Sequence, residues 1–130
     1  MKWLTMIVLA ILPSIAIAED DPFARYLYPP DLIMAHSHDL GLQDKQREMI
    51  KNEVQKAQSK FFDLQWQAKE ETDKMVKLLQ HSPADETKIL DEADRIMSLE
   101  RDIKRTHLTL LIHLRNLLTA EQQAKLQQFK

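Results

Sequence analysis

The chain has 130 residues, with 18 Lys and Arg against 20 Asp and Glu, a formal net charge of −2 and no cysteine. This near-neutral balance excludes a dedicated nucleic-acid binder, which would carry a strong basic excess. A chain of this size without disulfides needs another source of stability, and we expect it to be a homodimer. The single glycine and the many Gln, Lys, Glu, Leu and Ala residues indicate a mostly helical fold.

Residues 1–18 have the pattern of a secretory signal peptide. Lys2 supplies the positive start, residues 3–17 are largely apolar, and residues 16–18 (AIA) match a small-x-small cleavage site. The apolar run is shorter than the roughly 20 residues that span a bilayer, so we expect no stable membrane anchor after cleavage. The mature chain is then expected to begin at Glu19 and to be exported.

Residues 19–30 combine acidic, aromatic and proline residues and are expected to form an extended arm. The arm should be ordered only if Phe23, Tyr26 and Tyr28 dock on the helical body. A short helix is predicted to follow over residues 31–36, because two prolines stand at its N-terminal edge.

Two long helices are predicted next. Apolar residues recur in steps of three and four over residues 44–80, which indicates an amphipathic helix. Ser82 is the expected N-cap of the second helix, with Pro83 as its first residue and Asp85 as its N3 acid. This helix should run to about Leu118, so that each long helix has roughly 36 residues.

The fold class predicted from these segments is all-α. Two long helices joined by a tight turn form an antiparallel helical hairpin, with Gly41 ending the first short helix and a fourth helix over residues 119–130. Residues 108–114 (LTLLIHL) are apolar on nearly every side, which is more than one partner helix can cover. We therefore expect a thin, curved homodimer in which the short helices close the ends.

The most informative local pattern is the helix start at residues 118–122 (LTAEQ). Thr119 can act as the N-cap, and Gln122 stands three residues later, where its amide can reach back to the N–H of the cap residue. Residues 42–46 (LQDKQ) repeat the spacing at the start of the first long helix, but Gln43 occupies the position of the capping Thr.

This pair of motifs on either side of a long hairpin resembles the Spy/CpxP family of periplasmic chaperones, whose hallmark is a pair of Leu-Thr-x-x-Gln motifs. The resemblance covers residues 30–128, within a helical domain assigned to residues 31–130. It implies an ATP-independent chaperone in the periplasm that binds unfolded or misfolded envelope proteins and limits their aggregation. The residues of the two motifs are expected to be structural: Leu42, Gln46, Leu118, Thr119 and Gln122.

Phe61, Phe62 and Trp66 form the aromatic cluster of the helical body. Phe61 lies on the apolar stripe of its helix, whereas Phe62 and Trp66 lie roughly 100° and 140° away and are four residues apart. One interpretation is a second packing face for a dimer partner. The interpretation that the family resemblance favours is an exposed patch that contacts unfolded protein clients.

Histidines raise a metal-binding alternative, because relatives of the Spy/CpxP proteins include periplasmic heavy-metal sensors and resistance proteins. His36 and His38 are the candidate ligands for Zn²⁺, Ni²⁺ or Cu²⁺, with His107 as a further candidate. A solvated histidine pair and one satisfied core histidine would explain the same residues. The His-x-x-x-Met pair of the metal-sensing relatives aligns with Leu110 and Leu114 here, so that pair is missing.

No catalytic constellation is found, and we expect the protein not to be an enzyme and to need no cofactor. A third class of function is also open. One branch of the family acts on an envelope-stress sensor kinase, and basic residues gathered on one helix face would favour such a partner.

Overall fold

The computed structural model describes residues 21–130. A short 3₁₀ helix, η1 (Ala24–Tyr26), precedes four α-helices: α1 (Pro30–Ala35), α2 (Asp44–Leu79), α3 (Glu86–Leu117) and α4 (Ala120–Gln127). This part of the chain contains no strand, which confirms the predicted all-α class. The predicted signal peptide, residues 1–18, lies outside the described residues, and the homodimer stays a prediction.

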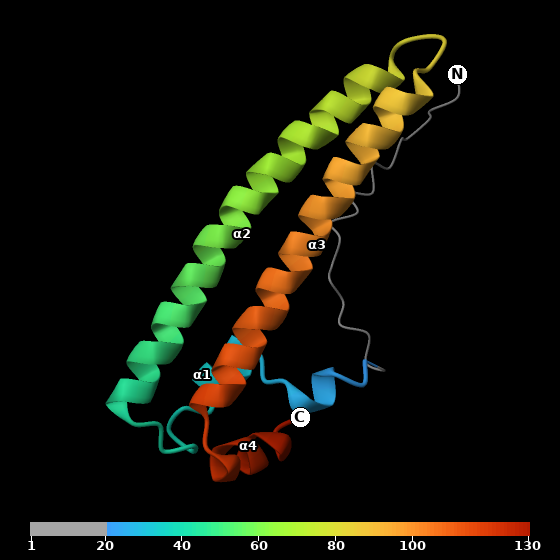
Figure 1. Ribbon diagram of the computed structural model, residues 1–130. Coiled ribbons are helices and arrows are strands. Elements are labelled where there is room, and N and C mark those ends of the chain that lie inside the picture. The colour runs from blue at the N-terminus through green and yellow to red at the C-terminus, as the bar shows by residue number, and fades with distance from the viewer. Residues whose placement is uncertain (1–20) are drawn as a thin grey trace, which may run out of the picture.

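The predicted hairpin is present: α2 and α3 run antiparallel along their whole length (Figure 1). The start of α3, however, was predicted wrongly. Ser82 and Pro83 lie in the connecting loop, and the N-cap is Asp85, whose carboxylate accepts a hydrogen bond from the N–H of Lys88 at 3.2 Å. A carboxylate at the N-cap also interacts favourably with the helix dipole, so Asp85 displaces Ser82. The helix consequently has 32 residues, against 36 in α2.

The hydrophobic core of the hairpin is concentrated toward its base. Ile50, Ala57 and Leu64 are buried at successive heptad positions of α2, and Leu110 and Leu114 are buried on the facing surface of α3. Closer to the tip, the apolar seam residues of both helices are only partly buried. Two long helices share one narrow seam, so burial at the base depends on additional segments.

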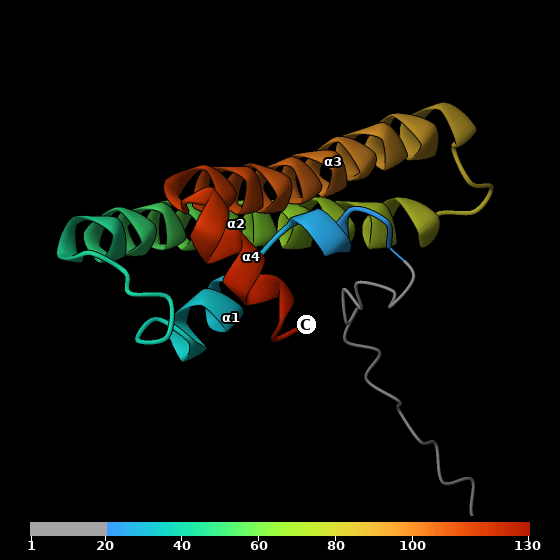
Figure 2. The same ribbon diagram turned by 90° about the horizontal axis from the view of Figure 1, so that it is seen from below.

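These segments are the short helices, and α1 and α4 lie on one side of the two-helix layer near its base (Figure 2). Ile33 of α1 and Leu126 of α4 are fully buried there. The first short helix ends at Ala35, earlier than predicted, and a series of turns leads from it to Gly41. Gly41 has a φ of +62°, as expected, but it ends these turns and not the helix.

The N-terminal arm docks through one of its three aromatic side chains. Tyr28 is buried, and its hydroxyl accepts a hydrogen bond from Gln127 of α4 at 3.0 Å. Lys130 extends over the Tyr28 ring and donates to the carbonyl of Leu27 at 2.7 Å. Phe23 and Tyr26, by contrast, are largely exposed. The fourth helix ends at Gln127, before the predicted end at residue 130, and its last residues hold the arm in place.

Candidate functional site

The two sequence motifs meet at the base of the hairpin, although the two long helices separate them in the sequence. The side-chain amide of Gln46 donates to Oε1 of Gln122 at 2.8 Å, and the amide of Gln122 donates back to Oε1 of Gln46 at 3.2 Å. Gln122 is buried and Gln46 partly buried, so this pair replaces hydrogen bonds to water. Gln46 and Gln122, two of the residues predicted as structural, therefore form one polar lock.

Each glutamine also caps the helix that begins at its own motif. Oε1 of Gln46 accepts from the N–H of Gln43 at 3.0 Å, and Oε1 of Gln122 accepts from the N–H of Thr119 at the same distance. In the second motif the Thr119 hydroxyl accepts from the N–H of Gln122 at 3.1 Å, which completes the predicted capping box. Leu42, the first residue of the other motif, is buried in the core beneath the lock.

The aromatic cluster divides between the seam and the outer surface. Phe61 is partly buried and packs against the hydrophobic core, with its ring 6.3 Å from that of His107. Phe62 and Trp66 are 61% and 54% exposed and contact each other edge to face, with ring centroids 6.1 Å apart. Together with Gln65 they border a shallow hollow of about 200 Å³. Of the three predicted client-contact residues, only Phe62 and Trp66 are largely exposed in one copy of the chain.

The outer face of α3 carries a second set of exposed apolar side chains that sequence reasoning did not single out. The set is Leu90, Met97, Leu108 and Ile112. Their spacings of seven, eleven and four residues keep them on one helix face, roughly opposite the buried seam. Leu108 and Ile112 belong to the segment that was predicted to be more apolar than one partner helix could cover. We call these four residues the α3 stripe.

The side of the hairpin that α1 and α4 leave uncovered carries charged residues. His113 Nδ1 of α3 lies 2.8 Å from Glu53 Oε2 of α2, and this hydrogen bond lowers the pKa of Glu53. Lys56, Lys60 and Arg105 border the same hollow, whose volume is about 250 Å³. The pair links residues 60 positions apart, which single-helix periodicity could not reveal.

Comparison with known protein families supplies the context for these features. A family model described as heavy-metal resistance matches residues 4–125, which is most of the chain. The chain belongs to this heavy-metal-resistance family. The match confirms the resemblance to the Spy/CpxP proteins that the two motifs indicated. No curated protein and no solved structure matches the chain.

Membership of the heavy-metal-resistance family makes the metal-ligand candidates worth testing against the geometry. His36 stacks on Phe129 with ring centroids 3.7 Å apart, and its Nδ1 lies 3.6 Å from a carboxylate oxygen of Asp39. His38 is exposed, and His107 is turned toward Phe61. Residues 21–130 contain no group of three or more His, Cys, Asp or Glu side chains placed to hold one metal ion.

Within the described residues, the candidates His36 and His38 do not converge with a third ligand. None of the helices in residues 21–130 has both the length and the apolar character required to cross a membrane. The same residues do carry exposed apolar surfaces, at Phe62 and Trp66 of α2 and along the α3 stripe.

Proposed function

We propose that this protein is an ATP-independent chaperone of the periplasm that binds unfolded or misfolded envelope proteins and limits their aggregation. The observation that carries the proposal is the exposure of large apolar side chains on the outer faces of both long helices. Phe62 and Trp66 supply the contact on α2, and the α3 stripe supplies it on the other helix. Membership of the heavy-metal-resistance family, with the resemblance to the Spy/CpxP chaperones, supports the proposal.

The physical basis is weak, sequence-tolerant association. Exposed apolar side chains gain free energy when any apolar segment covers them, and they need no matching shape because they stand on a convex helix surface. Charged residues interrupt the apolar positions: Arg101 and Lys104 lie between Met97 and Leu108, and Lys69 follows Trp66 by one turn. Such charges keep a bound segment hydrated and limit the contact area, so release requires no ATP.

The primary test is light scattering of a chemically denatured model protein, diluted with and without the purified chain in metal-free buffer. Suppression of aggregation at near-stoichiometric amounts supports the proposal. Trp66→Ala combined with Phe62→Ala should weaken suppression severalfold, and Leu108→Ser combined with Ile112→Ser should do the same for α3. Gln67→Ala is the matched control, because Gln67 is exposed on the same stretch of α2.

The same surfaces could serve a second copy of the chain, and the oligomeric state separates the two uses. Light scattering coupled to size-exclusion chromatography gives the mass of each variant. A client-contact variant should lose suppression while it keeps the mass of the parent protein. A variant that becomes monomeric and at the same time loses suppression would identify the substituted surface as the dimer interface instead.

A metal-responsive function is the second candidate, and the family description favours it. The test is a thermal-unfolding series with Zn²⁺, Ni²⁺ or Cu²⁺ added. Stabilisation that His36→Ala and His38→Ala abolish would support metal binding at the predicted histidines. Stabilisation that only His113→Ala abolishes would assign it to the Glu53–His113 pair, and no stabilisation would remove this candidate.

A signalling function remains a third proposal, in which the chain modulates an envelope-stress sensor kinase. Lys56, Lys60 and Arg105 border one hollow on the uncovered side of the hairpin, which suits an acidic protein surface. Charge reversal at Lys60 and Arg105 should then weaken binding to the sensor domain and reduce its salt dependence. A lack of binding at low ionic strength would count against this function.

A further inference from the structure

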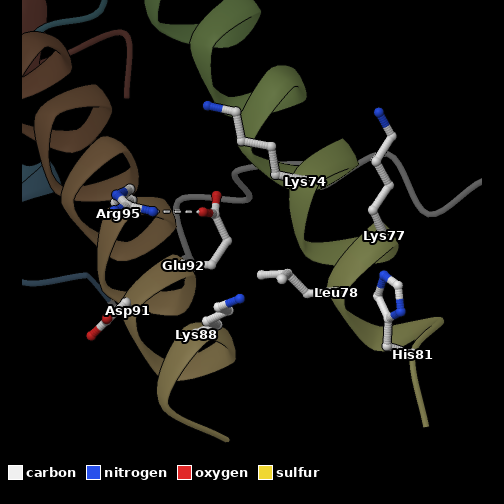
Figure 3. A pocket seen from close by; sticks show the side chains of 8 residues that line it. All are labelled: Lys74, Lys77, Leu78, His81, Lys88, Asp91, Glu92 and Arg95. Carbon is white, nitrogen blue, oxygen red and sulfur yellow. Dashed lines mark hydrogen bonds and ion pairs between the residues drawn. The ribbon is translucent and has the colours of Figure 1, made fainter. Parts of the chain in front are cut away.

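Glu71 of α2 and Glu92 of α3 lie within hydrogen-bonding reach of each other across the seam, in the half of the hairpin near its tip. Glu92 of α3 is 2% exposed, although a carboxylate is costly to bury. It precedes the core residue Leu110 by about five helical turns and so occupies a core position of α3. Glu71 of α2 is its counterpart, with a side chain that is 17% exposed. In Figure 3, Glu92 extends from α3 toward α2.

Each glutamate forms one ion pair on its own helix. Nη1 of Arg95 lies 3.0 Å from Oε2 of Glu92, and Nζ of Lys74 lies 2.9 Å from Oε1 of Glu71. The other two oxygens, Oε1 of Glu92 and Oε2 of Glu71, are buried and have no hydrogen-bond donor. Buried polar atoms without partners are rare in folded proteins, so this pair requires an explanation.

A proton is the simplest bridge between two facing carboxylates. When Glu92 carries it, its hydroxyl donates to the Glu71 carboxylate, and this hydrogen bond together with Lys74 lowers the pKa of Glu71. A metal ion fits less well, because Lys74 and Arg95 already place two positive charges beside the pair. With both carboxylates ionised, two buried oxygens would face each other with no donor between them.

The other charged groups around the pair lie on both helices and the loop. Together with Glu92 and its neighbours, they border one pocket of about 380 Å³ (Figure 3). These groups are Lys77, His81, Lys88 and Asp91. All four are exposed to solvent, so water screens their effect on the buried oxygens. The immediate partners of the two glutamates are Lys74 and Arg95.

We propose that Glu71 and Glu92 form an acid-strengthened latch, in which one shared proton joins α2 to α3 near the hairpin tip. The latch goes beyond the proposed chaperone function and does not depend on it. Near the tip the apolar seam residues are only partly buried, so a polar contact there has a large share in holding the helices together. Loss of the proton should let the tip open while the base stays closed.

The sign of the pH dependence follows from linkage. The closed pair retains a proton that the two glutamates release in the open tip, so the free energy of opening falls as pH rises. The exchange of one proton corresponds to a change of up to about tenfold in the opening equilibrium per pH unit. At strongly acidic pH both glutamates are protonated in either state, and the ion pairs with Lys74 and Arg95 are lost.

Hydrogen exchange of backbone amides over about pH 5 to 8, corrected for intrinsic exchange rates, measures this opening directly. Amides of residues 72–96 should lose protection as pH rises, by up to about tenfold per unit. Amides near Ala57 and Leu110 should not follow them, because they lie in the well-packed base.

Glu92→Gln decides between the latch and a general pH effect. Its amide can donate to Glu71 at every pH, so tip protection should stay at its acidic level throughout the range. Glu71→Gln should act in the same way with the roles exchanged, and Glu100→Gln, an exposed residue of α3, is the control. The latch is refuted if tip protection of the parent protein is independent of pH, or if Glu92→Gln keeps the parent's slope. Recovery of protection at neutral pH on addition of Ca²⁺ or Zn²⁺ would replace the proton by a bound cation.

Discussion

Gln46 and Gln122 lie 76 residues apart in the chain. The side chain of each accepts a hydrogen bond from the other glutamine and another from a backbone N–H at the start of its own helix. Each Oε1 accepts one hydrogen bond from a cap N–H and one from the partner glutamine. The remaining N–H of Gln46 reaches the carbonyl of Leu117 at 2.9 Å, and that of Gln122 approaches the carbonyl of Leu40 at 3.4 Å. Each motif thus contributes one glutamine to the same polar lock, which explains why both motifs end in glutamine.

The pair predicts strong coupling between the two glutamines. Gln122→Ala should lower the free energy of unfolding by about 2 to 3 kcal/mol, because it leaves buried partners without hydrogen bonds. Gln46→Ala should cost less, and the double variant should cost less than the sum by about 1 kcal/mol or more. Urea unfolding of the four proteins measures this cycle. Gln58→Ala, at an exposed position of α2, should be neutral, and strict additivity of the two motif variants would contradict the coupling.

The two motifs have different N-cap residues, Thr119 and Gln43, and substitution of these residues should have opposite effects on stability. Thr119→Ala removes the hydroxyl that accepts from the N–H of Gln122 and should destabilise the protein by about 1 kcal/mol. Gln43→Thr places the better cap residue at the start of α2 and should stabilise it by a few tenths of a kcal/mol up to about 1. Thermal unfolding measures both changes. A destabilising Gln43→Thr would mean that the Gln43 side chain has a role beyond capping.

Tyr28 should control the order of the N-terminal arm. Tyr28→Ala removes a buried aromatic ring and should cost about 3 kcal/mol, whereas Tyr28→Phe loses only the hydrogen bond from Gln127 and should cost about 1. Limited proteolysis near Arg25 should become faster in the same order. Tyr26→Ala, at an exposed ring, serves as the control and should leave the cleavage rate unchanged.

The Glu53–His113 contact predicts a small loss of stability in acid. His113 lowers the pKa of Glu53 from its ordinary value of 4.5, so its contribution is present above that pH and is lost as pH falls through the lower folded value. The effect should stay below about 1 kcal/mol, because the His113 side chain is half exposed. Glu53→Gln should reduce the slope of stability against pH between about pH 3 and 5. An unchanged slope would show that other carboxylates dominate.

Gly41 should be replaceable only at a cost set by its backbone conformation. Its φ of +62° is unfavourable for residues with a side chain, but a Cβ added there would meet no atom within 4 Å. Gly41→Ala should therefore destabilise the protein by about 1 kcal/mol, and Gly41→Asn by less, since Asn tolerates this region better. Urea unfolding would distinguish the two. Equal losses for both variants would point to a steric cause instead.

Sequence reasoning was most successful where the determinants are local. The hairpin follows from apolar periodicity, and the Thr119–Gln122 capping box follows from residues three positions apart. It failed at the start of α3, because Ser82 and Asp85 are both good N-caps and local preference does not rank them. It separated Phe61 from Phe62 correctly, since one helical step moves a side chain from the seam to the surface.

Three side-chain contacts that sequence reasoning missed join residues of different helices. Gln46 and Gln122 were interpreted as two independent caps, and nothing in either motif indicates that their amides pair. The Glu53–His113 and Glu71–Glu92 contacts depend on the axial register of α2 against α3. Periodicity defines which face of a helix is buried, but it leaves that register open. Only the assembled hairpin reveals which polar residues stand opposite each other.

The polar lock at the base has a consequence for the length of the hairpin. Among the described residues, the side-chain hydrogen bonds from α4 to the rest of the chain all involve residues at the base or in the docked arm. Seven residues added to each long helix would move the tip about 10 Å further from the base and leave the polar lock unchanged. Hairpin length is therefore free to vary in steps of paired heptads. A lineage could enlarge or shorten the presented surface without redesigning the end that holds the fold together.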